Sequence, residues 1–568
     1  MAAVPVSDWV TLNVGGRLFR TTRSTLCNDT ESILCKMFSE DSHWNLELDE
    51  NGHALLDADP RYFGTILNYL RMNEVIIDPG VSTKGILATA RYFNVSGVID
   101  YFQSERRQAL FSWGSGGSGE LGTQDKSDAL TPIRVDLVPP TTIAIEVALG
   151  ANFSCVLTEN GRVYVFGNGD WGQLGIGNPK NFHEKAEDKT PIMTVPTALP
   201  RLLPYRVVAT STGYAYAMAL TDDYQVFFWG NNNHGQSGLG VDHFGQAYRK
   251  IEEPMLVTSL LDKKIVQVGC GSFFVVALSA LNEGGTLYSW GLIDCLGQGT
   301  VEEVRTRYAE ETAESVSKDK RAVLLVPHVI DALTGKHVVK ITAGQWHSCA
   351  ITRTGELYTW GVGFQGRLGH GDKEPCFIPE RVEGSLVGKK VINVACGSFH
   401  TVALTADGEV YCWGDNANGQ CGNATLPDSV VLPHLVSALS LVGGGLARSI
   451  SCGRQHTAVV MTGCLHRRDP LRKRDLDWMG KADCRCGRDR TDYGQVYVFG
   501  ESKGMGLGSP NKVFSPKLVK GMEDYNVLEV VSGLHHTMII AETIPRDTAD
   551  NTRSYTRCYP NDDLDCDV

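Results

Sequence analysis

The sequence contains no apolar run of the roughly 18 residues that a membrane-spanning helix requires. Its first residues, MAAVPVSDWV, lack the basic and apolar regions of a secretory signal segment. These absences predict a cytoplasmic protein, with the nucleus as the alternative. The chain also has no P-loop sequence and no His-Glu-x-x-His zinc motif. We therefore expect no catalytic residue, no cofactor and no bound metal.

Positive charge is also scarce. The chain has 53 Lys and Arg against 65 Asp and Glu, a net charge of −12, which argues against nucleic acid as a partner. The 16 cysteines are scattered, and several, such as Cys155, Cys349 and Cys412, stand inside apolar strand-like runs. They are typical of small buried hydrophobic residues and not of a disulfide framework.

Internal repeats dominate the remainder of the chain. Trp-Gly or Phe-Gly follows an alternating apolar run seven times, at 113–114, 166–167, 229–230, 290–291, 360–361, 413–414 and 499–500. Alternation predicts a strand before each pair. Most pairs are followed by a glycine-rich phrase such as GNGDWGQLGIG, which is typical of tight turns.

A second phrase, Gly-x-x-aromatic or Gly-x-x-His before a β-rich run, also occurs seven times, at Gly150, Gly213, Gly271, Gly344, Gly397, Gly453 and Gly533. The first Trp-Gly has no such phrase before it, and the last phrase, SGLHHTMII, has no Trp-Gly after it. A ring in which the last strands complete the first blade uses every half-unit and leaves no exposed sheet edge. The sequence therefore predicts an all-β, seven-bladed propeller over residues 107–543.

The phrases GSFHTVALTADGEVYCWG and WGQLGIG resemble the repeats of the regulator of chromosome condensation (RCC1) family. This resemblance covers about three-quarters of the chain and implies the same seven-bladed propeller. His347, His400, His456 and His536 share one repeat position, which other repeats fill with Phe or Tyr. Because neither metal binding nor catalysis tolerates that exchange, we expect these histidines to be structural.

The first hundred residues have a different pattern. WVTLNVGGRLFRTT predicts two strands joined at Gly15-Gly16. In DADPRYFGTILNYLR, Asp59 is a helix N-cap, Pro60 occupies the first helical position, and apolar residues follow helical spacing. A further helix is predicted over 82–94. The segment is thus a small α/β (α+β) module.

LNVGGRLFRTTRSTL, LLDADPRYFGTILNYLR and ILATARYFNV closely resemble the BTB/T1 domain of the potassium-channel-tetramerisation-domain family. The resemblance places this domain at residues 8–105. It implies self-association into rings of four or five and docking on a cullin (type 3) ubiquitin-ligase scaffold. Relatives commonly carry Asp-Arg-Asp-Pro where this chain has Ala58 in place of Arg, which leaves the oligomer number open.

The resemblance also suggests site residues in the BTB/T1 domain. Asp57, Asp59 and Arg61 are candidates for polar contacts between protomers. Tyr92, with Phe93 beside it, matches the aromatic position that relatives offer to a cullin. The alternative is that Tyr92 and Phe93 only pack their helix onto the domain.

Two insertions and a tail depart from the repeat pattern. Residues 464–491 hold nine Lys and Arg against five Asp, which is typical either of a basic arm for an acidic partner or of an extraneous surface loop. Their Cys464, His466, Cys484 and Cys486 have poor spacing for zinc. Residues 300–322 are polar with helical character, and 544–568 form an acid-ended tail predicted to be disordered.

Three functions fit these domains. The first is a non-enzymatic oligomeric adaptor, in which the BTB/T1 domain recruits a cullin-type ligase while the propeller binds a protein substrate. The second is a guanine-nucleotide exchange factor or a scaffold that binds a small GTPase, by analogy with the founding member of the propeller family. The third is a structural hub. The sequence does not name the substrate.

Overall fold

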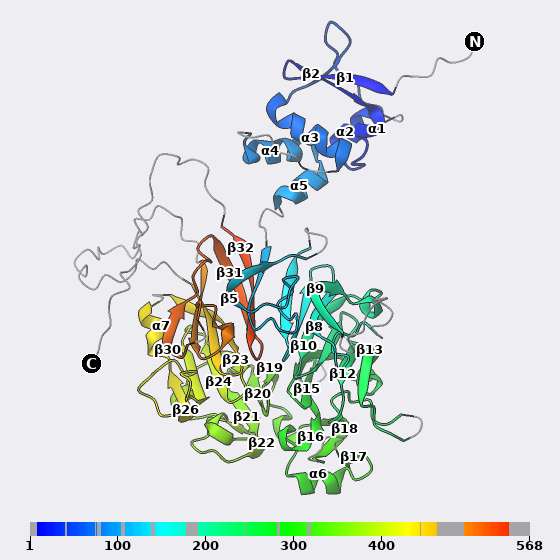
Figure 1. Ribbon diagram of the computed structural model, residues 1–568. Helices are drawn as coiled ribbons and strands as arrows, with labels where there is room; N and C mark the ends of the chain where they lie inside the picture. Colours follow the sequence, from blue (N-terminus) through cyan, green and yellow to red (C-terminus); the bar gives the residue numbers. More distant parts are fainter. Residues whose placement is uncertain are drawn as a thin grey trace, which may run out of the picture. The chain divides into compact units, whose positions relative to one another are not determined.

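The chain folds into two compact units, one within Met1–Arg107 and one spanning Gln108–Glu542. Figure 1 shows the computed structural model. It describes residues 8–39, 42–73, 75, 81–103, 108–137, 142–177, 191–242, 245–280, 285–314, 320–442, 445–462, 493–509 and 511–544. Among the helices in these ranges, none has both the length and the apolar character that crossing a membrane demands.

The N-terminal unit is a three-stranded sheet with five helices, the predicted α+β module. The sheet order is β2-β1-β3, with β1 antiparallel to β2 and parallel to β3. The elements are β1 (Trp9–Val14), β2 (Arg17–Thr22), α1 (Arg23–Leu26), α2 (Ile33–Phe38), β3 (Ala54–Leu56), α3 (Pro60–Met72), α4 (Thr83–Phe93) and α5 (Ser96–Gln103).

Local sequence explains the turn between β1 and β2 and the start of α3. Gly15 has a φ of 52°, and a Cβ there would lie 2.6 Å from the carbonyl oxygen of Ala58, so only glycine fits the turn between β1 and β2. Asp59 caps α3 by accepting a hydrogen bond from the amide of Arg61, and Pro60 opens the helix. Phe63 of α3 lies in the core beside Phe93 of α4.

The second unit is a seven-bladed propeller, as predicted. Each blade is an antiparallel sheet of four strands, and the fourth blade carries one additional strand. Blade 1 consists of β31 (Tyr525–Ser532), β32 (His536–Thr543), β4 (Gln108–Gly114) and β5 (Ala129–Val135). Blade 2 consists of β6 (Ala144–Leu149), β7 (Phe153–Thr158), β8 (Val163–Asn168) and β9 (Ile192–Ala198).

The other blades follow in chain order. Blade 3 has β10 (Val207–Thr212), β11 (Tyr216–Thr221), β12 (Val226–Asn231) and β13 (Lys250–Leu256); blade 4 has β14 (Ile265–Cys270), β15 (Phe274–Ser279), β16 (Leu287–Leu292), β18 (Ala322–Val329) and β17 (Thr312–Glu314). Blade 5 has β19 (Val338–Ala343), β20 (His347–Thr352), β21 (Leu357–Gly361) and β22 (Cys376–Arg381); blade 6 has β23 (Val391–Cys396), β24 (His400–Thr405), β25 (Val410–Asp415) and β26 (Ser429–Leu435); blade 7 has β27 (Leu446–Cys452), β28 (His456–Thr462), β29 (Gly494–Gly500) and β30 (Val513–Leu518).

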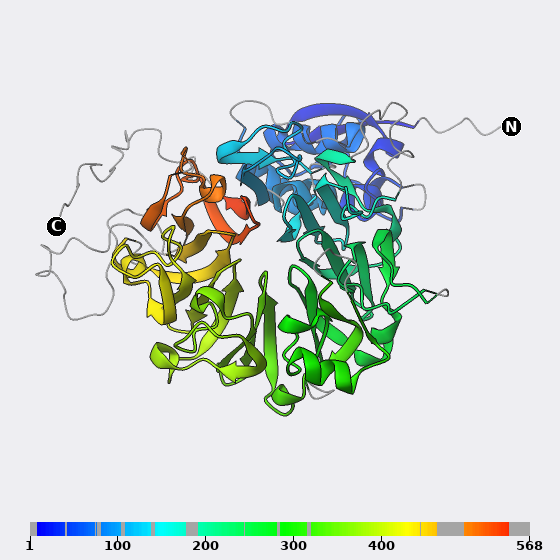
Figure 2. The same cartoon turned by 60° about the horizontal axis from the view of Figure 1, so that its bottom comes forward.

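The ring closes between the two ends of the propeller sequence. β32 pairs antiparallel with β4, from His536 opposite Gly114 to Glu542 opposite Gln108. The innermost strands pack one on the next around the whole ring, with β27 against β31 and β31 against β6. Figure 2 shows these blades around their common axis. The predicted closure of the last strands onto the first blade is confirmed.

The repeated Trp-Gly pair has a structural cause. Its glycine has a φ between 102° and 117° in all seven blades. At Gly414, a Cβ would lie 2.6 Å from the Cα of His400 on the paired strand. The aromatic residue before it is buried in every blade, and it is Phe in blades 2 and 7 and Trp, such as Trp413, in the other five. Each pair therefore combines a core side chain with a backbone position that only glycine can occupy.

The predicted insertions have different outcomes. Residues 300–322 carry a short helix, α6 (Val301–Arg307), which begins with a capping box between Thr300 and Glu303, and then β17 of blade 4. Another short helix, α7 (Ser437–Val442), follows blade 6. The basic insertion 464–491 and residues 545–568 of the tail lie outside the described residues.

Closure by β32 generates a prediction about stability. We expect deletion of residues 533–568 to abolish the cooperative unfolding transition of the propeller, because it leaves β31 and β4 of blade 1 without the strand between them. Deletion of 545–568 is the control and should leave the Tm within about 2 °C, since no described strand is lost. Differential scanning calorimetry measures both. A cooperative transition in the longer deletion would show that closure is dispensable.

Candidate functional site

The four repeat histidines link consecutive blades through hydroxyl groups. Each Nε2 lies within hydrogen-bond distance of a hydroxyl on the next blade. The pairs are His347 with Thr401 (2.9 Å), His400 with Thr457 (3.0 Å), His456 with Thr537 (3.1 Å) and His536 with Ser154 (3.0 Å). All four histidines are buried. They join blades 5, 6, 7, 1 and 2 in succession, a structural role that agrees with the prediction.

The same hydroxyl groups reach the glycine-rich loops. Thr401 donates to the carbonyl oxygen of Arg367 (2.7 Å), which also accepts from Trp413 Nε1 (3.0 Å). Because the threonine proton is used in this way, His347 must be the donor in its bond with Thr401. One carbonyl thus fixes a loop, a strand and the buried tryptophan of the following blade.

The histidine position is filled differently in blades 2, 3 and 4. Phe153 and Phe274 are buried there, and the hydroxyl of Tyr216 lies 2.8 Å from the carbonyl oxygen of Gly271. Packing is therefore common to all seven residues, whereas a titratable nitrogen is not.

Blade 5 and blade 6 meet at a group of metal-ligating side chains that the sequence analysis did not single out. Cys349 Sγ lies 3.2 Å from Cys396 Sγ, and a ring nitrogen of His347 and the two sulfurs all lie within 4.8 Å of one another. Burial raises the pKa of Cys349 well above its ordinary value. Burial acts in the same direction on Cys396, but its hydrogen bond with Cys349 and the neighbouring His347 and Thr342 side chains outweigh it and lower its pKa to about 6.

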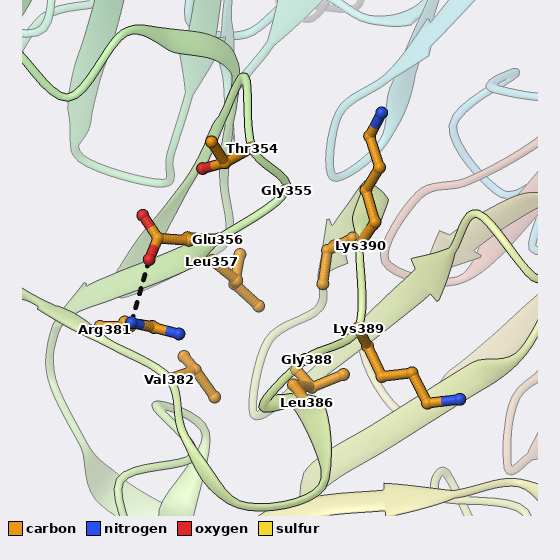
Figure 3. Close-up of a pocket in the computed structure, with 11 residues that line it drawn as sticks. Thr354, Gly355, Glu356, Leu357, Arg381, Val382, Leu386, Gly388, Lys389 and Lys390 are labelled. Atoms are coloured by element: carbon orange, nitrogen blue, oxygen red, sulfur yellow. Dashed lines mark ion pairs between the residues drawn. The ribbon is translucent and has the colours of Figure 1, made fainter.

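A small pocket of ≈ 190 Å³ lies between blade 5 and the start of blade 6 (Figure 3). Glu356 Oε1 pairs with Arg381 Nη1 at 2.9 Å, and the amino groups of Lys389 and Lys390 point away from that pair. Lys389 instead pairs with Glu409 at 2.8 Å. The pocket is smaller than sites for drug-sized ligands, which span about 300–1,000 Å³. Its charged side chains form ion pairs within blades 5 and 6.

An aromatic row crosses blades 3, 4 and 5 at the loop end of their strands. We define it as Tyr214, His234, Phe273 and Trp346. Phe273 is central, with ring centroids 6.3 Å from Tyr214, 4.5 Å from His234 and 5.2 Å from Trp346. The guanidinium of Arg321 lies 4.9 Å from the Trp346 ring. Tyr214 is exposed. Three of these aromatics stand within the Gly-x-x-aromatic phrases, a signal that the sequence analysis did not use.

The candidate polar contacts of the BTB/T1 domain lie around the start of α3. Asp57 and Arg61 are exposed, and Arg61 Nη2 lies 2.6 Å from Asp59 Oδ2 of the same chain. The hydrogen bond from Arg61 holds the pKa of Asp59 below its ordinary value. Asp59 therefore orients Arg61 at the surface, and their use between protomers stays a prediction.

The two candidate cullin contacts differ in accessibility. Tyr92 is 59% exposed, whereas Phe93 is 2% exposed and packs edge to face on Phe63 at 5.5 Å. Adjacent residues on a helix point about 100° apart, and at the end of α4 the core lies on the side of Phe93. Tyr92 is the side chain that a partner can reach without unfolding the domain.

The sheet of the BTB/T1 domain also exposes apolar side chains. Asn13 of β1 pairs with Leu18 of β2 and with Leu55 of β3, so all three side chains lie on one face. Leu18 is 55% exposed and Leu55 is 42% exposed, and Trp9 of β1 is exposed on the same face. The alternation of the strands is visible in the sequence, but only the structure shows that this face is exposed among the described residues of the domain.

The chain belongs to the RCC1-like domain family, whose model matches residues 102–396. RCC1 repeats match 391–420, 407–460 and 493–540, and the BTB/POZ domain matches 10–101. This is the domain order that the sequence predicted.

Several characterised proteins are similar to the propeller. The human E3 ubiquitin-protein ligase HERC2 is 33% identical over 61% of this chain, and the chain spans only 6% of HERC2. The ultraviolet-B receptor UVR8 of Arabidopsis thaliana is 28% identical over 71% of this chain and 76% of that protein. The secretion-regulating guanine nucleotide exchange factor of Bos taurus is 27% identical over 76% of this chain and 83% of that protein.

Solved structures agree on the propeller fold. Human WBSCR16 aligns with a TM-score of 0.58 at 20% identity over 77% of this chain and 100% of its own. Prp20p of Saccharomyces cerevisiae, whose structure is titled with its binding to Gsp1p and histones, aligns with a TM-score of 0.58 at 20% identity over 77% of this chain and 92% of its own. At this identity the likeness shows the fold alone.

The buried histidines predict a specific pH dependence. Burial lowers the pKa of His400, His456 and His536 to about 3, below the unfolded value of about 6.5. Each therefore stabilises the fold fully above pH 6.5, and that contribution falls by about 1.4 kcal/mol per pH unit as pH drops toward 3. Between pH 6 and pH 4, we expect the unfolding free energy of the wild type to fall by about 2.5 kcal/mol more than that of His456→Phe.

Urea unfolding followed by circular dichroism measures this difference. Phe is a native residue at this position in blades 2 and 4, so the variant should fold. His434→Phe, at a half-buried site on β26, is the matched control. Parallel pH profiles for the wild type and His456→Phe would contradict a neutral, buried His456.

Proposed function

We propose that this protein is a non-enzymatic oligomeric adaptor. In this proposal the BTB/T1 domain self-associates and docks on a cullin-type ubiquitin ligase, and the propeller binds a protein substrate. The observation that carries the proposal is the exposure of Tyr92 at the end of α4, in a unit that folds around its own core. The similarity of the propeller to part of a ubiquitin ligase, HERC2, supports the same class of function.

Self-association is supported by the exposed apolar side chains on one sheet face of the BTB/T1 domain. Exposed apolar side chains gathered on one face mark interaction surfaces more often than isolated ones do. Leu18 and Leu55 supply such a face, and Arg61 supplies an oriented charge near its edge at the start of α3. A second copy of the domain is the occupant that the BTB/POZ match favours.

Substrate binding by the propeller is supported by the aromatic row. Trp, Tyr and Arg carry a disproportionate share of binding energy in protein interfaces. Tyr214, Trp346 and Arg321 bring these three types together on neighbouring blades. The ring contacts fix the side chains before binding, which reduces the entropy lost when a partner docks.

A second candidate function is guanine-nucleotide exchange or GTPase binding through the propeller. It is favoured by the similarity to a secretion-regulating guanine nucleotide exchange factor over 76% of the chain. Exchange requires loops that displace a nucleotide and no acid–base catalyst. Affinity purification of the full chain followed by mass spectrometry separates the two candidates. Cullin peptides support the adaptor, and a stoichiometric nucleotide-free GTPase supports exchange.

The adaptor proposal predicts a defined oligomer. We expect the full chain to sediment as a tetramer or pentamer at tens of micromolar, and Arg61→Glu to weaken that assembly by about tenfold or more, because it reverses an oriented surface charge. Lys36→Glu is the charge-matched control at an exposed ion pair elsewhere in the domain. Analytical ultracentrifugation measures both. A monomeric wild type at this concentration would contradict the proposed self-association.

Cullin docking predicts a loss of binding without a loss of fold. Tyr92→Asp should abolish co-purification with a type 3 cullin, since a carboxylate replaces the exposed ring, while the circular dichroism spectrum and Tm stay unchanged. Tyr224→Asp is the control, because it makes the same change at an exposed tyrosine of the propeller. Equal cullin recovery from Tyr92→Asp and wild type would remove Tyr92 from the contact.

A further inference from the structure

The junction between blades 5 and 6 differs from the other six junctions. Cys349 is the third residue of the phrase that starts at His347, and Cys396 is the last residue of the inner strand on the next blade. The corresponding pairs at the other junctions, all within the described ranges, are Cys155 with Thr212, Met218 with Cys270, Val276 with Ala343, Val402 with Cys452, Ala458 with Ser532 and Met538 with Leu149. Two thiols meet only between blades 5 and 6, and a histidine adjoins them.

We propose that His347, Cys349 and Cys396 form a zinc-binding site that clamps blade 5 to blade 6. Thiolate and imidazole are the ligands that zinc prefers, and three protein ligands leave one position for water or another donor. The proposal is independent of the adaptor function, because it concerns the interior of the propeller.

The separations of the ligand atoms suit a tetrahedral ion after a small adjustment. The two sulfurs are 3.2 Å apart, and the imidazole nitrogen lies within 4.8 Å of both. Zn–S bonds of about 2.3 Å place two sulfurs about 3.8 Å apart in a tetrahedron. The thiols would separate by about half an ångström, which a change of side-chain rotation supplies without moving either strand.

The histidine is held in the tautomer that leaves Nδ1 free to ligate. His347 Nε2 donates to Thr401, whose own proton goes to the carbonyl oxygen of Arg367. Nδ1 therefore carries the lone pair, and among the described residues it has no hydrogen-bond partner although it is buried, as is also true of Nδ1 in His400, His456 and His536. What distinguishes His347 is that two thiols lie beside its ring. Metal-ligating histidines are usually fixed through the opposite nitrogen in this way. An unpaired buried acceptor is costly, and a bound cation removes that cost.

Secondary structure presents the two thiols from separate rigid elements. Cys349 pairs with Thr342 across β20 and β19, so both side chains lie on the same face of blade 5. The side chain of Thr342 also lies close to Cys396 of blade 6. Cys396 is only partly buried, which gives an ion access to the site. Both cysteines bind zinc as thiolates, so binding displaces any proton that either thiol still carries.

Zinc titration of the full-length protein tests the site. The protein is stripped with a chelator under reducing conditions, and zinc is added in competition with a chromophoric chelator. We expect the wild type to bind one zinc ion per chain more than Cys349→Val, His347→Phe or Cys396→Ala. Each of these changes introduces the residue that another blade carries at the same position, so folding should be preserved. Equal zinc stoichiometry in wild type and Cys349→Val would overturn the proposal.

Two control variants separate this site from other thiols. Cys452→Ser changes the corresponding thiol at the next junction, beside His400 and Val402, and should keep the ion. A triple change of Cys464, Cys484 and Cys486 to Ser removes the thiols of the basic insertion and should also keep it. Loss of the ion from the triple variant, with retention in Cys349→Val, would place zinc in the insertion and overturn the proposal.

Two further measurements make the outcome independent of stoichiometry alone. Cobalt(II) should give a sulfur-to-metal charge-transfer band in the wild type that is lost in Cys396→Ala. Zinc should raise the Tm of the wild type and leave that of Cys349→Val unchanged, because only the folded wild type binds the ion. A Cys349–Cys396 disulfide found by mass spectrometry, together with no zinc-dependent Tm shift after reduction, would replace the metal site by a redox pair.

Discussion

Antiparallel pairing of β32 with β4 is the constraint on which the propeller depends. It joins residues more than four hundred positions apart, and the loop entropy of such a contact is repaid only if it completes many others. It does so here. The pairing sets His536 opposite Gly114, from where His536 reaches Ser154 of blade 2, and it lets Trp113 donate to the carbonyl oxygen of Gly504 in blade 7. One seam thus connects blade 1 to both of its neighbours.

The bonds across each blade junction divide the repeat into fixed and variable positions. The histidine or aromatic, the Trp-Gly pair and the loop carbonyl each serve the ring itself, because they bond or pack onto the next blade. The residue directly before the histidine differs in type from blade to blade, and it is there that Phe273 and Trp346 occur. Specific chemistry can therefore vary from blade to blade while the closed scaffold stays the same.

Sequence reasoning succeeded where periodicity determines the structure. Each of the two repeated phrases occurs seven times, which predicted seven blades. The unpaired phrase at each end of the series also predicted the ring closure, because in a ring these two complete one blade. It failed where three-dimensional neighbours matter. Tyr92 and Phe93 were assigned together, yet helix geometry buries Phe93 and exposes Tyr92. Cys349 and Cys396 are 47 residues apart, and they meet only because consecutive blades face each other with a fixed offset. Their spacing in the sequence therefore does not indicate that the two thiols adjoin.

The division into two units has a consequence for the proposed adaptor. The BTB/T1 domain and the propeller each have their own core, so a partner bound to one does not need to remodel the other. In the proposed adaptor, the BTB/T1 domain affects substrate binding through the number of propellers that it brings together. In a ring of four or five chains, the second substrate contact becomes intramolecular, and avidity can exceed the affinity of one propeller by about 10²–10⁴. In the proposed adaptor, a substrate site as small as the aromatic row would be sufficient, because several copies would together supply the affinity that one such surface lacks.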